Sequence, residues 1–273
     1  MPELPEVQVV INYLNKSILN KKIKNVDVKM SKFLKNSNVD QFKKFFKNHY
    51  FKNIIRRAKY LIFILENDSV MVSHLRMEGK YNCDNEITKH DYIVFYFDDG
   101  SILKYNDTRQ FGTFNIYKNL DLAYNSKELK KLGYEPFDKN FNAEILYEML
   151  KKSNKKIKTF LLDQTKLVGL GNIYVNEVCF KTKIDPSIIA NKINQKQAHD
   201  ILEATREILA DSIKHNGTTI HSFTFNKWTT GNYQDKLMIH QKKECPICHS
   251  KITPYKINGR GTYACHKCQK GNK

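Results

Sequence analysis

The sequence predicts an α+β protein in which an N-terminal helix and an antiparallel β-sandwich domain precede a helical domain and a small cysteine-rich module. Three observations support this prediction. Apolar residues recur at helical spacing in the first 19 residues, β-branched and aromatic segments recur between residues 23 and 117, and helical spacing returns after residue 127. Four of the six cysteines lie within the last 29 of the 273 residues, in two closely spaced pairs.

The first element is an amphipathic helix over roughly residues 3–19. Its apolar residues are three or four positions apart and form one stripe: Leu4, Val7, Ile11, Leu14 and Ile18. A proline in the first turn of a helix is ordinary, because its missing N–H would have no helical partner. Helix physics alone therefore explains the opening MPELPEV, and a function for it needs other support.

The β-sandwich domain is predicted from short segments rich in β-branched and aromatic residues. They lie at 23–30, 60–67, 69–75, 91–97, 101–106 and 112–117. Asp99-Gly100 stands between two of these segments and is a strong hairpin signal. We therefore expect an antiparallel sandwich or barrel, with the N-terminal helix packed against it.

The second half of the chain has the periodicity of helices. The segments with this pattern are 143–153, 156–164, 172–180 and 195–217, the last ending in Asn216-Gly217, a plausible C-cap. The period changes near residues 125–140. The predicted domains are 1–130 for the β-sandwich domain, 131–235 for the helical domain and 236–273 for the cysteine module.

The composition indicates a polyanionic partner. The chain has 46 Lys and Arg against 28 Asp and Glu, a formal net charge of +18 spread along its length. Nucleic acid fits this charge better than a membrane, since no stretch approaches 18 uncharged apolar residues. The first residues lack a basic region and an apolar core, so we expect no signal peptide and a cytoplasmic location. In that reducing compartment Cys83 and Cys179 are expected to be buried thiols.

The cysteine pairs predict one structural Zn²⁺ site. Cys245 and Cys248 form one C-x-x-C pair, and Cys265 and Cys268 form the other after sixteen residues. Two such pairs fit four thiolates around zinc, with no open position for water. A pair of disulfides and an iron–sulfur cluster are the alternatives. Between the pairs, Gly-Arg-Gly at 259–261 would present Arg260 to phosphates, although a solvated arginine is the simpler reading.

Eight segments together resemble the formamidopyrimidine-DNA glycosylase family of bacteria. They are PELPEV at 2–7, RRAKYL at 56–61, HLRMEGK at 74–80, KHD at 89–91, NDTRQFG at 106–112, GLGNIYVNE at 169–177, NGTT at 216–219 and the C-terminal cysteine pairs. The resemblance covers essentially the whole chain. It implies a β-sandwich domain, a helix-two-turn-helix domain and a zinc-finger hairpin, which clamp double-stranded DNA that carries oxidised bases or abasic sites.

The resemblance also implies a reaction and the residues that perform it. After removal of Met1, the amine of Pro2 attacks C1′ of the damaged nucleotide, forms a Schiff base and releases an oxidised purine, 8-oxoguanine or a formamidopyrimidine. β,δ-elimination then cuts the strand. Glu3 matches the residue for proton transfer to the sugar, Glu6 stabilises positive charge, Lys59 assists β-elimination, and Arg260 grips phosphates and is linked to δ-elimination. An α-amino group suits this chemistry, because its pKa is about 7.7–8.0.

Seven further residues match positions that contact DNA in the family. Met77, Arg109 and Phe111 match the residues that fill the space left by an extruded base, although Met and Phe are more often core residues. The positions associated with backbone contact are His74, His90, Lys158 and Asn172, the last at a helix start after a glycine-rich turn.

Three departures from the family pattern are Gln8, Gln110 and HSFT at 221–224. The last concerns the loop that reads the lesion and bears on substrate preference. The alternatives are an endonuclease VIII-like enzyme for oxidised pyrimidines and a non-catalytic zinc-ribbon protein that binds DNA or RNA. We expect a monomer, because the DNA duplex supplies the second surface.

Overall fold

A computed structural model describes residues 1–218 and 231–270. These residues form two compact units. The first contains Met1–Lys131 and the described part of Asn216–Asn232, and the second contains Leu132–His215 and Tyr233–Lys273 as far as residue 270. The division differs from the predicted domains in that residues 216–218 belong to the first unit, and the cysteine module is grouped with the helices of the second. The departure at 221–224 lies outside the described residues.

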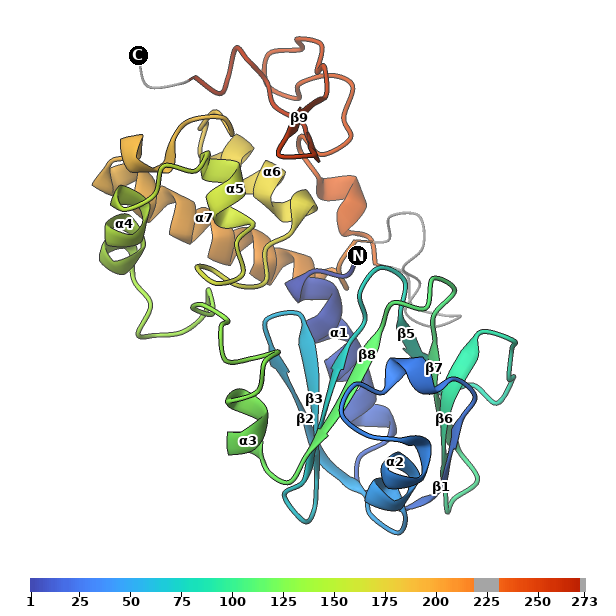
Figure 1. Cartoon of the computed structure of the whole chain (residues 1–273). Helices are drawn as coiled ribbons and strands as arrows, with labels where there is room; N and C mark the ends of the chain where they lie inside the picture. The colour runs from blue at the N-terminus through green and yellow to red at the C-terminus, as the bar shows by residue number, and fades with distance from the viewer. Residues whose placement is uncertain (219–230, 271–273) are drawn as a thin grey trace. The chain divides into compact units, whose positions relative to one another are not determined.

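The first unit is built from helix α1 (Leu4–Ser17) and two antiparallel four-stranded sheets (Figure 1). One sheet has the order β1-β6-β7-β5, with β1 Ile23–Val28, β5 Lys80–Asn82, β6 Asp91–Phe97 and β7 Ile102–Asn106. The other has the order β2-β3-β4-β8, with β2 Phe51–Arg57, β3 Tyr60–Leu65, β4 Val70–His74 and β8 Thr113–Tyr117. The predicted β-sandwich and the β6–β7 hairpin are both confirmed.

The core of this unit joins the apolar face of α1 to both sheets. Val7, Ile11 and Leu14 are almost fully buried in one cluster with aromatic residues of the strands. A second helix, α2 (Val39–Phe46), adds Phe42 and Phe46, whose rings meet edge to face at 4.8 Å. This packing fixes α1, and therefore the first residues of the chain, against the sandwich. The short helices η1 (Ser31–Phe33) and α3 (Leu120–Tyr124) complete the unit.

Within its described residues, the second unit contains four α-helices, two short 3-10 helices and a hairpin. The helices are α4 (Ala143–Lys151), α5 (Ile157–Leu161), α6 (Asn172–Lys181) and α7 (Gln195–Lys214). Helix α7 ends three residues before the predicted end, and Asn216 and Gly217 follow it in left-handed conformations. The unit also contains the short helices η2 (Ala190–Lys192) and η3 (Tyr233–Lys236). Its hairpin is formed by β9 (Tyr255–Ile257) and β10 (Arg260–Thr262).

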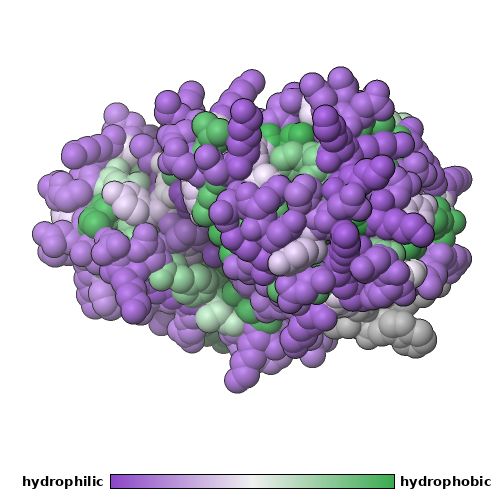
Figure 2. All heavy atoms as spheres, turned by 90° about the horizontal axis from the view of Figure 1, so that it is seen from below, coloured by the Kyte–Doolittle hydropathy of each residue, from purple (hydrophilic) through white to green (hydrophobic). Residues whose placement is uncertain are grey.

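The surface agrees with the basic, polar composition. Figure 2 shows a face on which hydrophilic residues predominate and hydrophobic residues form separate small patches. Within the described residues, no helix is both long and apolar enough to cross a membrane.

Candidate functional site

Helix α1 begins in a buried, hydrogen-bonded turn. Pro2, Glu3 and Glu6 are all buried. The backbone N–H of Glu3, the N-cap, donates to Oε2 of Glu6 at 2.8 Å. The carboxylate one turn into the helix thus satisfies a backbone donor at its start, which fixes the entry of the chain.

The second oxygen of the Glu6 carboxylate binds a distant part of the chain. Oε1 accepts from the backbone N–H of Thr218 at 2.9 Å and from its hydroxyl at 3.0 Å. Gly217 precedes this contact with φ +74°, and a Cβ there would lie 2.9 Å from the same oxygen. Glu6 therefore joins the start of α1 to residues 216–218, a role that the sequence did not reveal.

The N-terminal amine lies among ionisable groups of the first unit. Burial lowers the pKa of the Met1 amine. The carboxylates of Glu3, Glu6 and Glu78 act in the opposite direction, and the positive charge of Lys59 adds to the lowering. A lowered pKa raises the unprotonated fraction of a terminal amine near neutrality.

Lys59 is presented by the turn between β2 and β3. Arg57 pairs with Tyr60, so only Ala58 and Lys59 form the connection. The side chain of Lys59 is buried, with 5% exposure, although lysine is usually exposed. Because Lys59 is buried and acts electrostatically on the terminal amine, it is a better candidate for a catalytic residue than for an ordinary surface lysine.

Met77, Arg109 and Phe111 are also in the first unit. Met77 is 37% exposed and Phe111 53% exposed, which excludes the core positions typical of these residue types. The guanidinium of Arg109 lies 5.2 Å from the centre of the Phe111 ring. An exposed aromatic ring paired with a cation can contact both bases and phosphates.

A single buried carboxylate holds the loop that carries Arg109 and Phe111. Asp107 accepts hydrogen bonds from the backbone N–H groups of four successive residues, at 2.8 to 3.1 Å: Arg109, Gln110, Phe111 and Gly112. The departure Gln110 donates to the Tyr92 hydroxyl at 2.7 Å and accepts from Lys32 at 2.5 Å. The sequence analysis missed Asp107, although aspartate before a turn is a known signal.

The two histidines of this unit that are predicted to contact DNA differ in burial. His74 is buried, its ring meets Tyr60 edge to face at 4.5 Å, and Nδ1 accepts from the backbone N–H of Arg76 at 2.9 Å. Burial lowers the pKa of His74 to about 3, with contributions from the charges of Arg76 and Lys59. The neutral ring therefore carries its proton on Nε2. His90 is half-buried, with Nδ1 3.3 Å from the Tyr92 hydroxyl.

In the second unit, Lys158 lies in the interior. Its side chain is fully buried, and Nζ donates to Asn176 Oδ1 at 2.9 Å, Gly261 O at 2.7 Å and Thr262 Oγ1 at 3.0 Å. The contact with the DNA backbone predicted for Lys158 is therefore replaced by a supporting position, because no part of the side chain reaches the surface.

Asn172 contacts the backbone of Gly261, the residue that follows Arg260. Asn172, the first residue of α6, donates from Nδ2 to Gly261 O at 3.0 Å. Arg260 is exposed and precedes that glycine in β10, after Asn258 and Gly259 with φ of 46° and 74°. The hairpin tip is thus tied directly to the start of α6, the helix end that favours anions.

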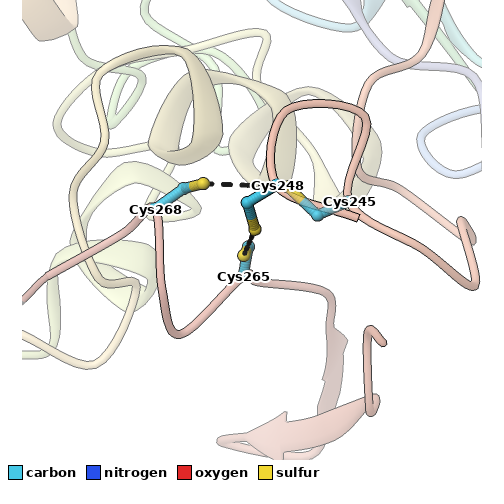
Figure 3. Close-up of side chains that lie close together, drawn as sticks. All are labelled: Cys245, Cys248, Cys265 and Cys268. Atoms are coloured by element: carbon cyan, nitrogen blue, oxygen red, sulfur yellow. Dashed lines mark hydrogen bonds between the residues drawn. The ribbon is translucent and has the colours of Figure 1, made fainter. Parts of the chain in front are cut away.

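The four C-terminal cysteines form a compact cluster in the second unit (Figure 3). The sulfur atoms of Cys245 and Cys268 are 3.8 Å apart, those of Cys248 and Cys265 are 3.4 Å apart, and all four lie within 4.8 Å of one another. Tetrahedral thiolates with Zn–S bonds of about 2.3 Å are separated by about 3.8 Å. The donor set and its spacing therefore fit one metal ion.

A buried glutamate anchors the segment that leads into this cluster. Glu177 of α6 accepts from the backbone N–H groups of Met238, Ile239 and His240 at 2.7, 3.0 and 2.8 Å. Burial raises the pKa of Glu177, while these three hydrogen bonds oppose the rise. The residue stood in the GLGNIYVNE segment, but nothing in the sequence assigned it this partner.

The comparisons with known proteins agree with this arrangement. Residues 1–114 match the formamidopyrimidine-DNA glycosylase N-terminal domain, and residues 132–224 match the formamidopyrimidine-DNA glycosylase H2TH domain. The formamidopyrimidine-DNA glycosylase of Mycoplasma pneumoniae is 47% identical over 275 residues, covering 98% of this chain and 99% of that protein.

Two solved structures are similar over nearly the whole chain. Wild-type Lactococcus lactis Fpg (MutM), in complex with DNA that contains N7-benzyl-Fapy-dG, superposes with a TM-score of 0.91 at 37% identity. MutM in complex with DNA that contains carbocyclic 8-oxo-G gives 0.90 at 38% identity. Each covers 98% of this chain and is itself covered to 99%.

A sandwich that buries the N-terminal residues and a helical unit with four clustered cysteines, together with these similarities, define a class of DNA repair proteins. The chain belongs to the formamidopyrimidine-DNA glycosylase family.

Proposed function

We propose that the protein is a bifunctional DNA glycosylase and AP lyase that removes oxidised purines from double-stranded DNA. The observation that carries the proposal is the buried start of α1, where Pro2, Glu3 and Glu6 are buried and the charges of Glu3, Glu6 and Lys59 act on the N-terminal amine. Only an amine can form a Schiff base with the opened sugar. The similarity to proteins solved with Fapy-dG and 8-oxo-G in DNA supports the substrate class.

The nucleophile in this proposal is the secondary amine of Pro2 after removal of Met1. Its nitrogen forms a bond to C1′, the bond from C1′ to the base breaks, and the base leaves with a proton. The sugar ring opens to give the iminium ion. Glu3, buried beside the amine, is placed to give a proton to the ring oxygen as the ring opens.

Strand cleavage follows from the iminium ion. Loss of a C2′ proton breaks the bond from C3′ to its phosphate, and a second elimination breaks the bond at C5′. Lys59 assists the first step from its buried turn, and Arg260 holds a phosphate at the second. The product is a one-nucleotide gap with a phosphate at each end.

Base extrusion needs groups that occupy the vacated space. Exposed Met77 and Phe111 serve as apolar wedges, and Arg109 faces the unpaired base. His74 contributes a neutral Nε2–H donor, and His90 and Asn172 contact the DNA backbone. The cysteine cluster holds one structural Zn²⁺, which stabilises the hairpin of Arg260. We also propose that the protein is cytoplasmic and monomeric.

Borohydride trapping tests the proposal. The protein is incubated with duplex DNA that contains 8-oxoguanine opposite cytosine, and reduction by borohydride should yield a covalent adduct. The adduct should disappear in protein that retains Met1, as identified by mass spectrometry, because the Pro2 nitrogen is then an amide. Pro2→Gly, which keeps a terminal amine but loses the rigid ring, should form the adduct more slowly. A matched duplex with an oxidised pyrimidine tests the substrate class. Absence of both adduct and strand cleavage on the purine duplex would sink the proposal.

A further inference from the structure

We infer that Arg56 is a positioning residue for Lys59, and that Gln8 holds Arg56 in place from α1. This inference rests on the proposed role of Lys59 in the reaction. Gln8 departs from the family pattern, and Arg56 opens the RRAKYL segment that contains Lys59. The structure gives both residues specific partners in the first unit.

The turn that carries Lys59 has an unfavourable backbone conformation. It contains only two residues between β2 and β3, and Ala58 has a φ of 53°. Glycine is the usual residue at a positive φ, because a Cβ clashes with the backbone there. A strained residue directly before a buried functional lysine persists only where the surroundings impose it.

Arg56 supplies that constraint. Its Nη1 donates to the carbonyl oxygen of Ala58 at 2.9 Å. This carbonyl belongs to the peptide group that joins Ala58 to Lys59, so the hydrogen bond fixes the plane from which the Lys59 side chain departs. A guanidinium is planar and holds its donors in fixed directions, which makes it suited to orienting a single peptide group.

Gln8 fixes the other edge of the guanidinium. Its Oε1 accepts from Arg56 Nε at 3.1 Å, and its Nε2 donates to Asn12 Oδ1 at 2.9 Å. Glutamine can accept and donate at once, whereas a glutamate at this position could only accept. Asn12, Gln8, Arg56 and Ala58 therefore form one chain of hydrogen bonds, which links α1 to the turn of Lys59.

This chain has a geometric consequence for the reaction. Helix α1 begins beside the N-terminal amine, and the β2–β3 turn carries the lysine whose charge acts on that amine. The helix that places the nucleophile thus also sets, through Gln8 and Arg56, the orientation of the peptide group before Lys59. A displacement of about 1 Å in a reacting group can cost on the order of a hundredfold in rate.

The test compares Arg56→Met with Lys52→Met. Both substitutions remove one positive charge from β2, but Lys52 is exposed and pairs with Asp68. Arg56→Met should slow single-turnover cleavage of an abasic duplex by roughly tenfold to a hundredfold. Lys52→Met should leave the rate within about twofold. Arg56→Lys should not restore the rate, because one ammonium cannot occupy both guanidinium positions.

A double-mutant cycle separates positioning from general damage to the fold. If Arg56 acts through Lys59, Arg56→Met should cause no further loss of rate in a Lys59→Met background. An equal loss in both backgrounds would overturn the inference. In Arg56→Met, the additional substitution Ala58→Gly should restore thermal stability but not the cleavage rate. Restoration of both would overturn the inference, because the loss of rate would then follow from the loss of stability.

A second readout does not depend on activity. Hydrogen exchange of a peptide that spans residues 57–61 should accelerate in Arg56→Met and in Gln8→Ala, and it should remain unchanged in Lys52→Met. Unchanged exchange in Arg56→Met would contradict the constraint on the turn, whatever the protein does to DNA. Failure of wild-type protein to form the borohydride adduct would instead refute the proposed function and leave the exchange result to decide on the constraint.

Discussion

The ammonium nitrogen of Lys158 lies 2.7 Å from the carbonyl oxygen of Gly261, the residue after Arg260. Asn172 donates to the same oxygen at 3.0 Å. Two residues of the helical region therefore hold the backbone of the hairpin that presents Arg260. Three acceptors surround Lys158 in the interior, and together they use the three donors of its ammonium group.

Lys158→Met should destabilise the second unit. The substitution keeps most of the side-chain volume but leaves three acceptors without their donor, at roughly 1–3 kcal/mol for each buried group. Denaturant unfolding measures the change, and the exposed neighbour Lys155, whose replacement by Met should cost less than about 1 kcal/mol, is the control. Equal stabilities of the two variants would contradict the supporting position of Lys158.

The burial of His74 should make stability depend on pH. Its pKa is about 3 in the folded protein against 6.5 for an ordinary histidine. Below pH 6.5 the unfolded chain takes up a proton that the folded protein does not, so the free energy of unfolding should fall between pH 6.5 and 3. The stabilisation is fully present above pH 6.5. Urea unfolding of wild type and His74→Gln at pH 7 and pH 5 measures it, and the variant should show a smaller decrease.

His240 contributes to the same pH window, because burial lowers its pKa to about 4. His240→Gln in parallel separates the two histidines. An identical loss of stability at pH 5 in wild type and both variants would contradict the assignment.

Glu6→Gln should shift the pH dependence of adduct formation. The Glu6 carboxylate raises the pKa of the Met1 amine, and we expect it to act in the same direction on the amine of Pro2, so its neutralisation should lower that pKa and move the acidic limb of the trapping rate to lower pH. Trapping rates across pH 5–8 measure the shift, with Asp40→Asn as a control from the exposed first turn of α2. A shift to higher pH would contradict this electrostatic role.

Asp107→Asn should loosen the loop of Arg109 and Phe111. The amide retains one acceptor oxygen, so about half of the four backbone N–H groups lose a partner at about 1–3 kcal/mol in all. Binding to an abasic-site duplex, measured by fluorescence anisotropy, should weaken by roughly tenfold or more. Asp121→Asn in α3 should leave affinity unchanged. Wild-type affinity in Asp107→Asn would show that the loop does not need this anchor.

Zinc removal should unfold the hairpin that carries Arg260. Cys265 is buried in the core of the cysteine cluster, and Cys265→Ser should abolish stoichiometric zinc and tight DNA binding. Metal analysis and anisotropy measure the two effects. Cys83→Ser, outside the cluster, should retain both zinc and binding. Full DNA affinity in zinc-free protein would contradict a structural role for the metal.

The long periodic elements could be predicted from the sequence. The apolar stripe of α1 follows directly from local spacing, because one face of the helix is buried. The strands of the sandwich follow from short segments rich in β-branched and aromatic residues. Strand β2 was missed, since Lys52, Asn53, Arg56 and Arg57 interrupt its apolar pattern. Helix α2 was missed because its eight residues show only one short apolar repeat. Short elements are stabilised mainly by tertiary contacts, which the sequence does not display.

The supporting contacts could not be predicted for the same reason. Lys158 and Gly261 are 103 residues apart, and Glu6 and Thr218 are 212 apart. A lysine that satisfies buried carbonyls and a lysine that binds phosphate have the same sequence signature, because both need only a long cationic side chain. The family resemblance predicted the chemistry near the N-terminus, whereas the partners of each charge became known only from the fold.

The burial of Pro2 has a consequence for the order of events during protein synthesis. The side chain of Met1 is 48% exposed, but Pro2 is packed at the start of α1. An aminopeptidase must enclose the residues on both sides of the bond that it cuts, and the folded protein offers only one of them. The proposed use of the Pro2 amine therefore requires that Met1 is removed from the nascent chain, before α1 packs. A molecule that folds too early would keep a blocked amine for its lifetime.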